Sequence, residues 1–395
     1  MADLFAAIWD TGQRAQHGCG VSGAATGLAI GAGIALIVIT SVSVLRTLVV
    51  PRGLISRLSM FGDRNLHRLF RMAARRARTY AGKDRILTYE GPVRLLGYLV
   101  LWLSILLMAF SLIFWPFEDS FPAAIAAAGS AMFTLGFVPV SGPVPYAAAF
   151  LAAAAGLSVV ALEIAYLPSI YGAFNRREVL VTMLSSRAGS PPWGPEVLAR
   201  HALIGSLGDM PQFFRDWELW AADLAESHTN YPVLLAFRSP EPLRSWVVAL
   251  NAMLDAAALY LTLAPRRAPS QANSFIRMGY VSLREIATVL RIDFDPDPLP
   301  EDPIDLTYEE FRAAAEMLDE TGFPREVSPQ EAWTQFHGWR VNYEALVYDI
   351  ANRTTAPPGL WSGHRDGLAG VVFAPERPRH RHPGGEETHV HSVGE

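Results

Sequence analysis

The chain has 395 residues, of which 51% are hydrophobic and only 18% are charged, and its mean hydropathy is +0.20. A soluble protein usually carries about 25% charged residues, so this composition argues against a wholly soluble chain. The net charge of −5 is too small to identify a partner. The single cysteine, Cys19, excludes an internal disulfide framework and a cysteine-based metal site.

Three long uncharged runs are candidates for membrane-spanning helices. They cover residues 21–45, 95–117 and 146–174, and only the third is interrupted by a charge, at Glu163. About 20 residues suffice to cross a ~30 Å hydrocarbon core as an α-helix. The first run exceeds the ~7–15 apolar residues of a signal peptide and no basic stretch precedes it, so we interpret it as an anchor.

Basic residues set the expected orientation. Arginines are dense between the first two runs, whereas only Arg14 precedes the first run and none lies in residues 118–145. They return after the third run at Arg176, Arg177 and Arg187. The positive-inside rule therefore predicts an N-terminus outside, a cytoplasmic C-terminal region and an odd number of crossings. We expect a multi-pass protein of the cell membrane (inner or plasma membrane).

A shorter apolar segment, residues 121–137, precedes a cluster of Pro139, Gly142, Pro143 and Pro145. If this segment crossed the membrane, the arginines from Arg176 onward would lie outside. We therefore expect a re-entrant segment, with a short helix over 122–133 followed by irregular backbone at membrane depth. Such backbone is tolerated only where it is buried in protein or lines a water-filled cavity. A fourth crossing is the alternative.

Thr134, Leu135, Gly136 and Phe137 follow this short helix and resemble the opening of the potassium-channel filter signature, Thr-Val-Gly-Tyr-Gly-Asp. The resemblance covers about residues 95–175, including the helices expected on either side. It implies a filter in which backbone carbonyls replace the hydration shell of a monovalent cation, with K⁺ as the expected ion and no other cofactor. Glycine permits the left-handed backbone that such a path needs. One loop per chain cannot close a ring, so the resemblance also implies a homotetramer.

The sequence departs from the signature at its outer end. Val138 stands where the family has its second glycine, and Pro139 replaces the aspartate. A β-branched residue resists a positive φ, and proline supplies neither an N–H nor a carboxylate. We therefore expect the outer filter position at Val138 to have a different shape. The alternative is a loop that has become a structural plug and does not conduct.

Four further residues are candidates for roles in such a pore. Glu163 is an inner-pore candidate, because intramembrane acids tend to face a cavity or a partner; its alternative is a carboxylate paired with an arginine such as Arg176. Gly156 is a candidate gating hinge or a close-packing position. Glu118 and Asp119 form either an acidic outer vestibule or an ordinary polar loop.

The stretch from Arg64 to Arg85 places apolar residues at helical spacing against a dense arginine face. This pattern is typical of an interfacial amphipathic helix on anionic membrane lipid. A solvated basic loop is the alternative.

The C-terminal half reads as an aqueous helical region. Residues 249–263 are very apolar but include Asp255, which favours a buried core helix over a span. Capping boxes at Thr307/Glu310 and Ser328/Glu331 predict two helix starts. The expected divisions are 1–50 (N-terminus and first span), 51–94 (basic linker), 95–175 (pore), 176–292 (helical domain), 293–306 (acidic, Pro-rich linker), 307–374 (C-terminal helices) and 375–395 (disordered tail).

Together these patterns predict an all-α integral membrane protein with three transmembrane helices, a re-entrant pore helix with its filter loop, and a helical cytoplasmic domain. The leading hypothesis is a potassium-channel-like cation channel, and nothing in the sequence indicates an enzyme, a metal site or a nucleic-acid partner. The alternative is a membrane-anchored signalling or sensor protein whose pore loop does not conduct.

Overall fold

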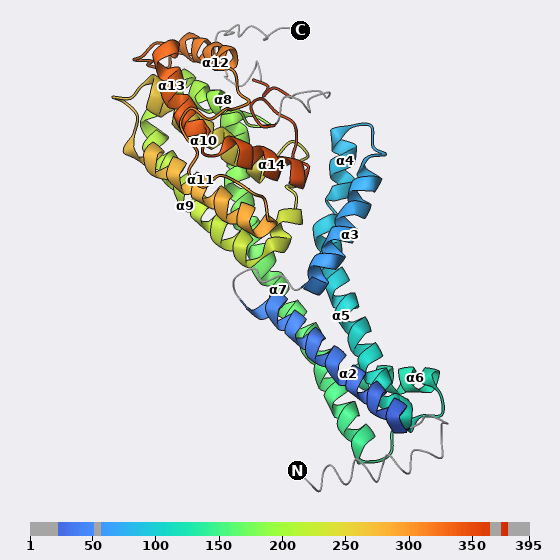
Figure 1. The fold of residues 1–395 in the computed structure, drawn as a ribbon. Coiled ribbons are helices and arrows are strands. Elements are labelled where there is room, and N and C mark those ends of the chain that lie inside the picture. Colours follow the sequence, from blue (N-terminus) through green and yellow to red (C-terminus); the bar gives the residue numbers. More distant parts are fainter. Residues whose placement is uncertain (1–22, 51–56, 364–372, 378–395) are drawn as a thin grey trace. The chain divides into compact units, whose positions relative to one another are not determined.

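The computed structural model describes residues 23–50, 57–363 and 373–377, and in helix α3 (Arg57–Ala74) it describes side chains from residue 65 onward (Figure 1). All regular elements in these ranges are helical, and the only β-type pairing is an isolated bridge between Gly359 and Phe373. The expectation of an all-α chain is confirmed. The N-terminal residues 1–22, the tail 378–395 and the side chain of Arg64 lie outside the described part.

The chain divides into two compact units. The first contains residues up to Arg76 together with Ile86–Gly172, and the second contains Ala77–Arg85 together with Ala173 and the residues after it. The boundary at Gly172 falls inside one uninterrupted helix, α7 (Pro143–Ala188).

The described residues contain four helical segments that are long and apolar enough to cross a membrane. Three correspond to the runs expected from the sequence: α2 (Gly23–Val44) with its extension Leu45–Val49, α5 (Glu90–Phe114), and α7. The fourth is α10 (Trp246–Leu263), of which 94% is buried within the protein. This burial agrees with the core helix that Asp255 predicted. These helices therefore indicate a membrane protein.

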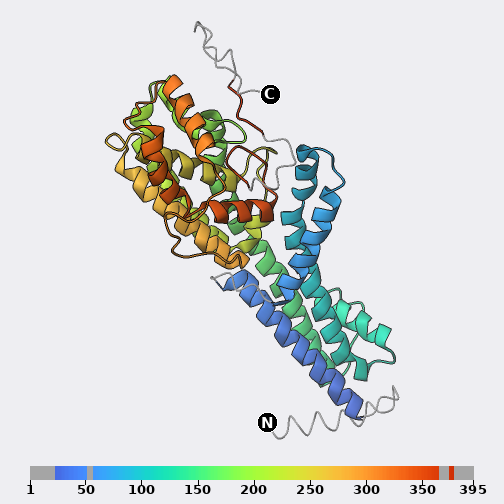
Figure 2. The same cartoon turned by 45° about the horizontal axis from the view of Figure 1, so that its top comes forward.

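The helices of the first unit pack closely through small residues. Figures 1 and 2 show α2, α5 and the first part of α7 running beside one another, with α6 (Phe121–Met132) at the end of this bundle where α5 finishes. A Cβ atom added to Gly33 of α2 would lie 2.6 Å from the carbonyl oxygen of Ala109 in α5. The indole of Trp102 donates to the Ser43 hydroxyl over 3.1 Å, which satisfies both groups inside the bundle.

The basic stretch between α2 and α5 forms two helices rather than one. Helix α3 (Arg57–Ala74) ends before α4 (Tyr80–Leu87) begins. Helix α3 packs against α5, and His67 Nδ1 lies 2.8 Å from the Glu90 carboxylate. The expectation of one helix from Arg64 to Arg85 is therefore wrong, because a non-helical turn separates Ala74 from Tyr80. Anionic lipid as a partner stays a prediction.

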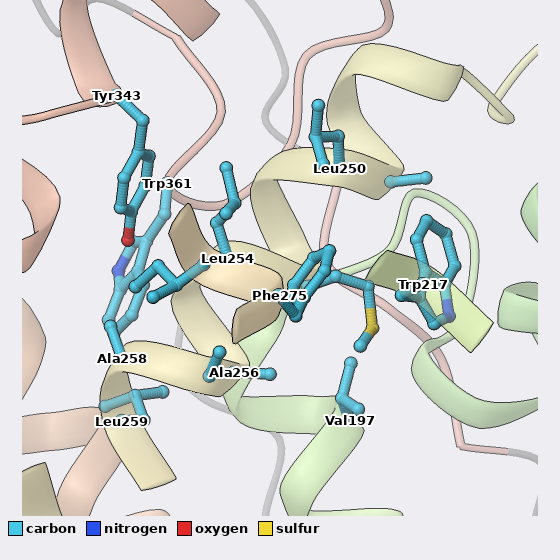
Figure 3. Close-up of a cluster of buried hydrophobic side chains, with 14 of the residues drawn as sticks. Val197, Trp217, Leu250, Leu254, Ala256, Ala258, Leu259, Phe275, Tyr343 and Trp361 are labelled. Carbon is cyan, nitrogen blue, oxygen red and sulfur yellow. The ribbon is translucent and has the colours of Figure 1, made fainter. Parts of the chain in front are cut away.

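The second unit is built around α10. Around α10 lie α8 (Gly194–Leu203), α9 (Met210–Asn230), α11 (Ser270–Leu290), α12 (Tyr308–Glu320), α13 (Pro329–Arg340) and α14 (Glu344–Thr354), and the unit also includes most of α4 and the end of α7. Figure 3 shows side chains of several of these helices meeting α10, among them Val197, Trp217 and Phe275. One continuous hydrophobic core extends from Val181 to Trp361. Residues on both sides of the acidic linker 293–306 therefore contribute to a single core.

Both predicted capping boxes are present. The Thr307 hydroxyl accepts from the Glu310 amide while the Glu310 carboxylate accepts from the Thr307 amide, and Ser328 and Glu331 do the same. Each pair satisfies backbone donors that the first turn of a helix leaves free.

Candidate functional site: the loop after helix α6

Helix α6 is short and well anchored. Its N-cap, Ser120, accepts a hydrogen bond from the Ala123 amide, and Ala124, Ala127 and Ala128 are buried. Twelve residues span about 18 Å as an α-helix, against ~30 Å for a hydrocarbon core. Helix α6 is therefore too short to cross a membrane by itself.

The first residues after α6 form a Schellman-type helix end. The Thr134 amide donates to the Ala131 carbonyl over 3.0 Å, and the Leu135 amide donates to the Ser130 carbonyl over 2.8 Å. Thr134 has a φ of +55°, the left-handed conformation that this motif requires. The hydrogen bonds of the helix end therefore account for the sharp turn between Phe133 and Leu135.

Ser130 holds the loop through both its carbonyl oxygen and its hydroxyl. Its carbonyl also accepts from the Gly136 amide over 3.3 Å, and its buried hydroxyl accepts from the Val138 amide over 3.1 Å. Three amides of the loop thus point toward the end of α6. In a trans peptide the C=O points opposite to the N–H. The carbonyl oxygens of Thr134, Leu135 and Phe137 therefore turn away from α6.

The loop contains two left-handed residues separated by one. Gly136 has a φ of +69°, as the resemblance implies for a filter glycine. Thr134 adopts the same region although a β-branched residue there costs roughly 1–2 kcal/mol. Such local strain tends to occur at functional sites, where surrounding structure enforces it. Val138 is not among the described residues with positive φ. The backbone at Val138 therefore differs from the left-handed backbone at Thr134 and Gly136.

The side chains of the loop are largely open in the single chain. Leu135 is 62% exposed and Phe137 is 63% exposed, and Thr134 is exposed as well. Neighbouring apolar side chains at this exposure are typical of a surface that contacts lipid or another protein chain.

The two vestibule candidates lie at the other end of α6. Glu118 and Asp119 precede Phe121, whereas the loop follows Met132, about 18 Å along the helix axis. Partial burial and the neighbouring charge of Asp119 raise the pKa of Glu118. The structure therefore separates these acids from the Ser130-bound loop within one chain.

Gly156 and Glu163 both lie on the buried stripe of α7. A Cβ atom at Gly156 would clash with the Met132 carbonyl at the end of α6, so a close packing contact accounts for this glycine. Glu163 is buried, and its Oε2 atom has no hydrogen-bond partner among the described residues. The opposite stripe of α7 is open and apolar, with Leu157 60% and Ile164 62% exposed. Glu163 therefore faces the interior of its own chain.

Arg176 does not pair with Glu163. Its guanidinium binds Asp223 of α9, with Nη2 at 2.9 Å from Oδ1.

The sequence did not point to Ser130, although Ser130 accepts hydrogen bonds from three amides of the loop. A serine four residues before Thr134 is a weak signal, because serine is common near helix ends. In the part of the chain that the structure describes, no group of three or more His, Cys, Asp or Glu side chains could hold a metal ion.

Comparisons with known proteins place the chain in no family. No family model matches it, and no curated protein and no solved structure matches it either.

Proposed function

We propose that the chain is one subunit of a homotetrameric cation channel, with potassium as the expected ion and the loop from Thr134 to Val138 as the conducting filter. The observation that carries the proposal is the arrangement around Ser130. It binds the amides of the loop, so the carbonyl oxygens of Thr134, Leu135 and Phe137 point away from the end of α6. Rings of backbone carbonyls are the ligands with which a channel replaces the hydration shell of a cation.

The remaining parts support this proposal by their lengths and order. A long apolar helix, a helix too short to span, an irregular stretch and a second long helix follow one another as α5, α6, the loop and α7. At membrane depth, irregular backbone is expected only where it is buried in protein or lines a water-filled cavity. In a tetramer, neighbouring copies would cover Leu135 and Phe137.

Cation flux into liposomes tests the proposal. We expect the purified wild-type protein to admit K⁺ faster than empty vesicles and Gly136→Ala to abolish most of this flux, because alanine disfavours a φ of +69°. Gly31→Ala is the matched control: a Cβ there meets nothing within 4 Å. A wild-type protein that reconstitutes correctly and admits neither K⁺ nor Na⁺ would contradict the proposal.

A membrane-anchored signalling protein is the second candidate function. The observation that favours it is the helix end itself, since the hydrogen bonds to Ser130 would stabilise a purely structural loop equally well. In that case the helical second unit would be the effector, and substitutions in the loop would leave its activity unchanged.

A further inference from the structure

Residues 234–238 of the second unit connect two helices that continue into the first unit. We propose that this strip, the coupling segment, ties α4 to α7 so that a displacement of one helix is transmitted to the other. The proposal concerns the second unit itself and does not depend on conduction. Its consequence for gating rests on the proposed function.

On one side the coupling segment is bound to α7. The Arg177 guanidinium donates to the Leu234 carbonyl over 3.0 Å and to the Phe237 carbonyl over 2.8 Å. The rings of Phe174 and Phe237 pack with their centroids 5.8 Å apart. The Arg177 side chain is only 1% exposed, so these hydrogen bonds are shielded from water and from competing ions.

On the other side the coupling segment is bound to α4. Arg238 forms an ion pair with Asp84 and donates to the Tyr80 hydroxyl over 2.6 Å. The same guanidinium reaches the end of α14, donating to the carbonyls of Thr354 over 2.6 Å and Thr355 over 2.9 Å. Thr355 has a φ of +53°, and it ends α14 in the left-handed conformation.

The two attachments lie next to each other in the chain. Phe237, whose carbonyl binds Arg177, is followed directly by Arg238, so one rigid peptide unit separates them. Hydrogen bonds of charged groups are stronger than neutral ones, and removing one partner of a buried pair leaves the other charge unsatisfied. Detaching the coupling segment from either helix would therefore cost free energy, because charged groups would lose their hydrogen-bond partners. Movement of one helix would in turn strain the hydrogen bonds to the other.

Both attached helices lead along the chain directly into the first unit. Only two residues separate α4 from α5, and Tyr89 between them has helical φ and ψ. Helix α7 is unbroken from Pro143 to Ala188. If the chain is a channel, α5 and α7 are the helices on either side of its filter loop, so the coupling segment would make them move together.

Hydrogen exchange on the full-length protein in lipid nanodiscs tests this coupling. Asp84→Asn removes the charge that α4 presents to Arg238. We expect about tenfold faster exchange in α4, and also several-fold faster exchange in residues 173–188 of α7, to which Asp84 is linked through the coupling segment. Arg85→Gln changes the charge of an exposed neighbour and should alter neither helix. Helix α12 reports on global loosening and should exchange as in the wild type.

Faster exchange in α4 with unchanged exchange in 173–188 would overturn the proposal. The reciprocal variant Phe237→Leu keeps every charge and weakens the ring contact with Phe174; we expect it to speed exchange in α4 as well. If Asp84→Asn also speeds exchange in α12, the Phe237→Leu variant becomes the deciding test. Unchanged exchange in α4 of that variant would then refute the coupling. K⁺ flux measured on the same samples separates the two proposals, because a wild type without flux contradicts the channel and not the exchange result.

Discussion

Arg177 donates a hydrogen bond to Nε2 of His228 over 3.1 Å inside the second unit. A guanidinium has donors only, so Nε2 must accept and His228 must be neutral with its proton on Nδ1. The Nδ1–H group then donates a hydrogen bond to the Leu224 carbonyl over 3.0 Å. Protonation of Nε2 would place two cations in contact in a fully buried position.

The stability of the second unit should therefore fall in mild acid. Burial, and then the charge of Arg177, hold the pKa of His228 well below its usual value. The unfolded chain takes up the proton below pH ~6.5 while the folded chain does not, so the contribution of His228 to stability is constant above that pH and decreases by up to ~1.4 kcal/mol per pH unit below it. Urea unfolding of the full chain in nanodiscs between pH 5 and pH 7.5 measures this slope. His228→Gln should reduce the dependence of the unfolding free energy on pH. An unchanged slope would contradict the conclusion that neutral His228 causes it.

Thr134→Gly separates the two candidate functions. Glycine adopts the φ of +55° without the roughly 1–2 kcal/mol that threonine costs, so the variant should be at least as stable as the wild type. In a channel, the loss of the threonine and of local rigidity should lower K⁺ flux several-fold. In a signalling protein, activity should stay unchanged. Liposome flux and thermal unfolding, measured together, distinguish these outcomes.

Gly156→Ala should loosen the contact between α6 and α7. The added Cβ would clash with the Met132 carbonyl, and overpacking of this kind costs typically ~1–3 kcal/mol. Gly97→Ala in α5 is the control, because its Cβ meets nothing within 4 Å. Thermal unfolding in nanodiscs should show a lower midpoint for Gly156→Ala alone. Equal midpoints for both variants would mean that α7 does not pack against Met132.

Arg340→Met should strongly destabilise the second unit. Arg340 is fully buried, forms ion pairs with Asp255 and Glu344, and donates to the Tyr348 hydroxyl over 2.8 Å. Removing one partner of a buried ion pair costs ~3–5 kcal/mol, because the remaining carboxylates lose their counter-charge. Arg312→Met, at a position 52% exposed, should cost less than ~1 kcal/mol. Urea unfolding followed by tryptophan fluorescence compares the two, and similar midpoints would contradict the role of Arg340.

Local patterns predicted the helices well. The uncharged runs correspond to α2, α5 and α7, and the capping boxes at Thr307 and Ser328 start α12 and α13. The turn that separates α3 from α4 was not predicted, because the apolar spacing continues through it. At the loop, the left-handed Gly136 followed from its residue type, whereas the left-handed Thr134 did not, since threonine rarely adopts that conformation.

The sequence by itself determined that this chain is helical and that part of it is apolar enough for a membrane, because helix formation, capping and hydrophobic runs depend on residues a few positions apart. Only the tertiary structure decided which charged groups are satisfied and by what. Arg238 meets Asp84 across 154 positions, and Arg340 meets Asp255 across 85. Such pairs form because packing removes these groups from water, and a buried charge must then find a partner wherever the fold brings one.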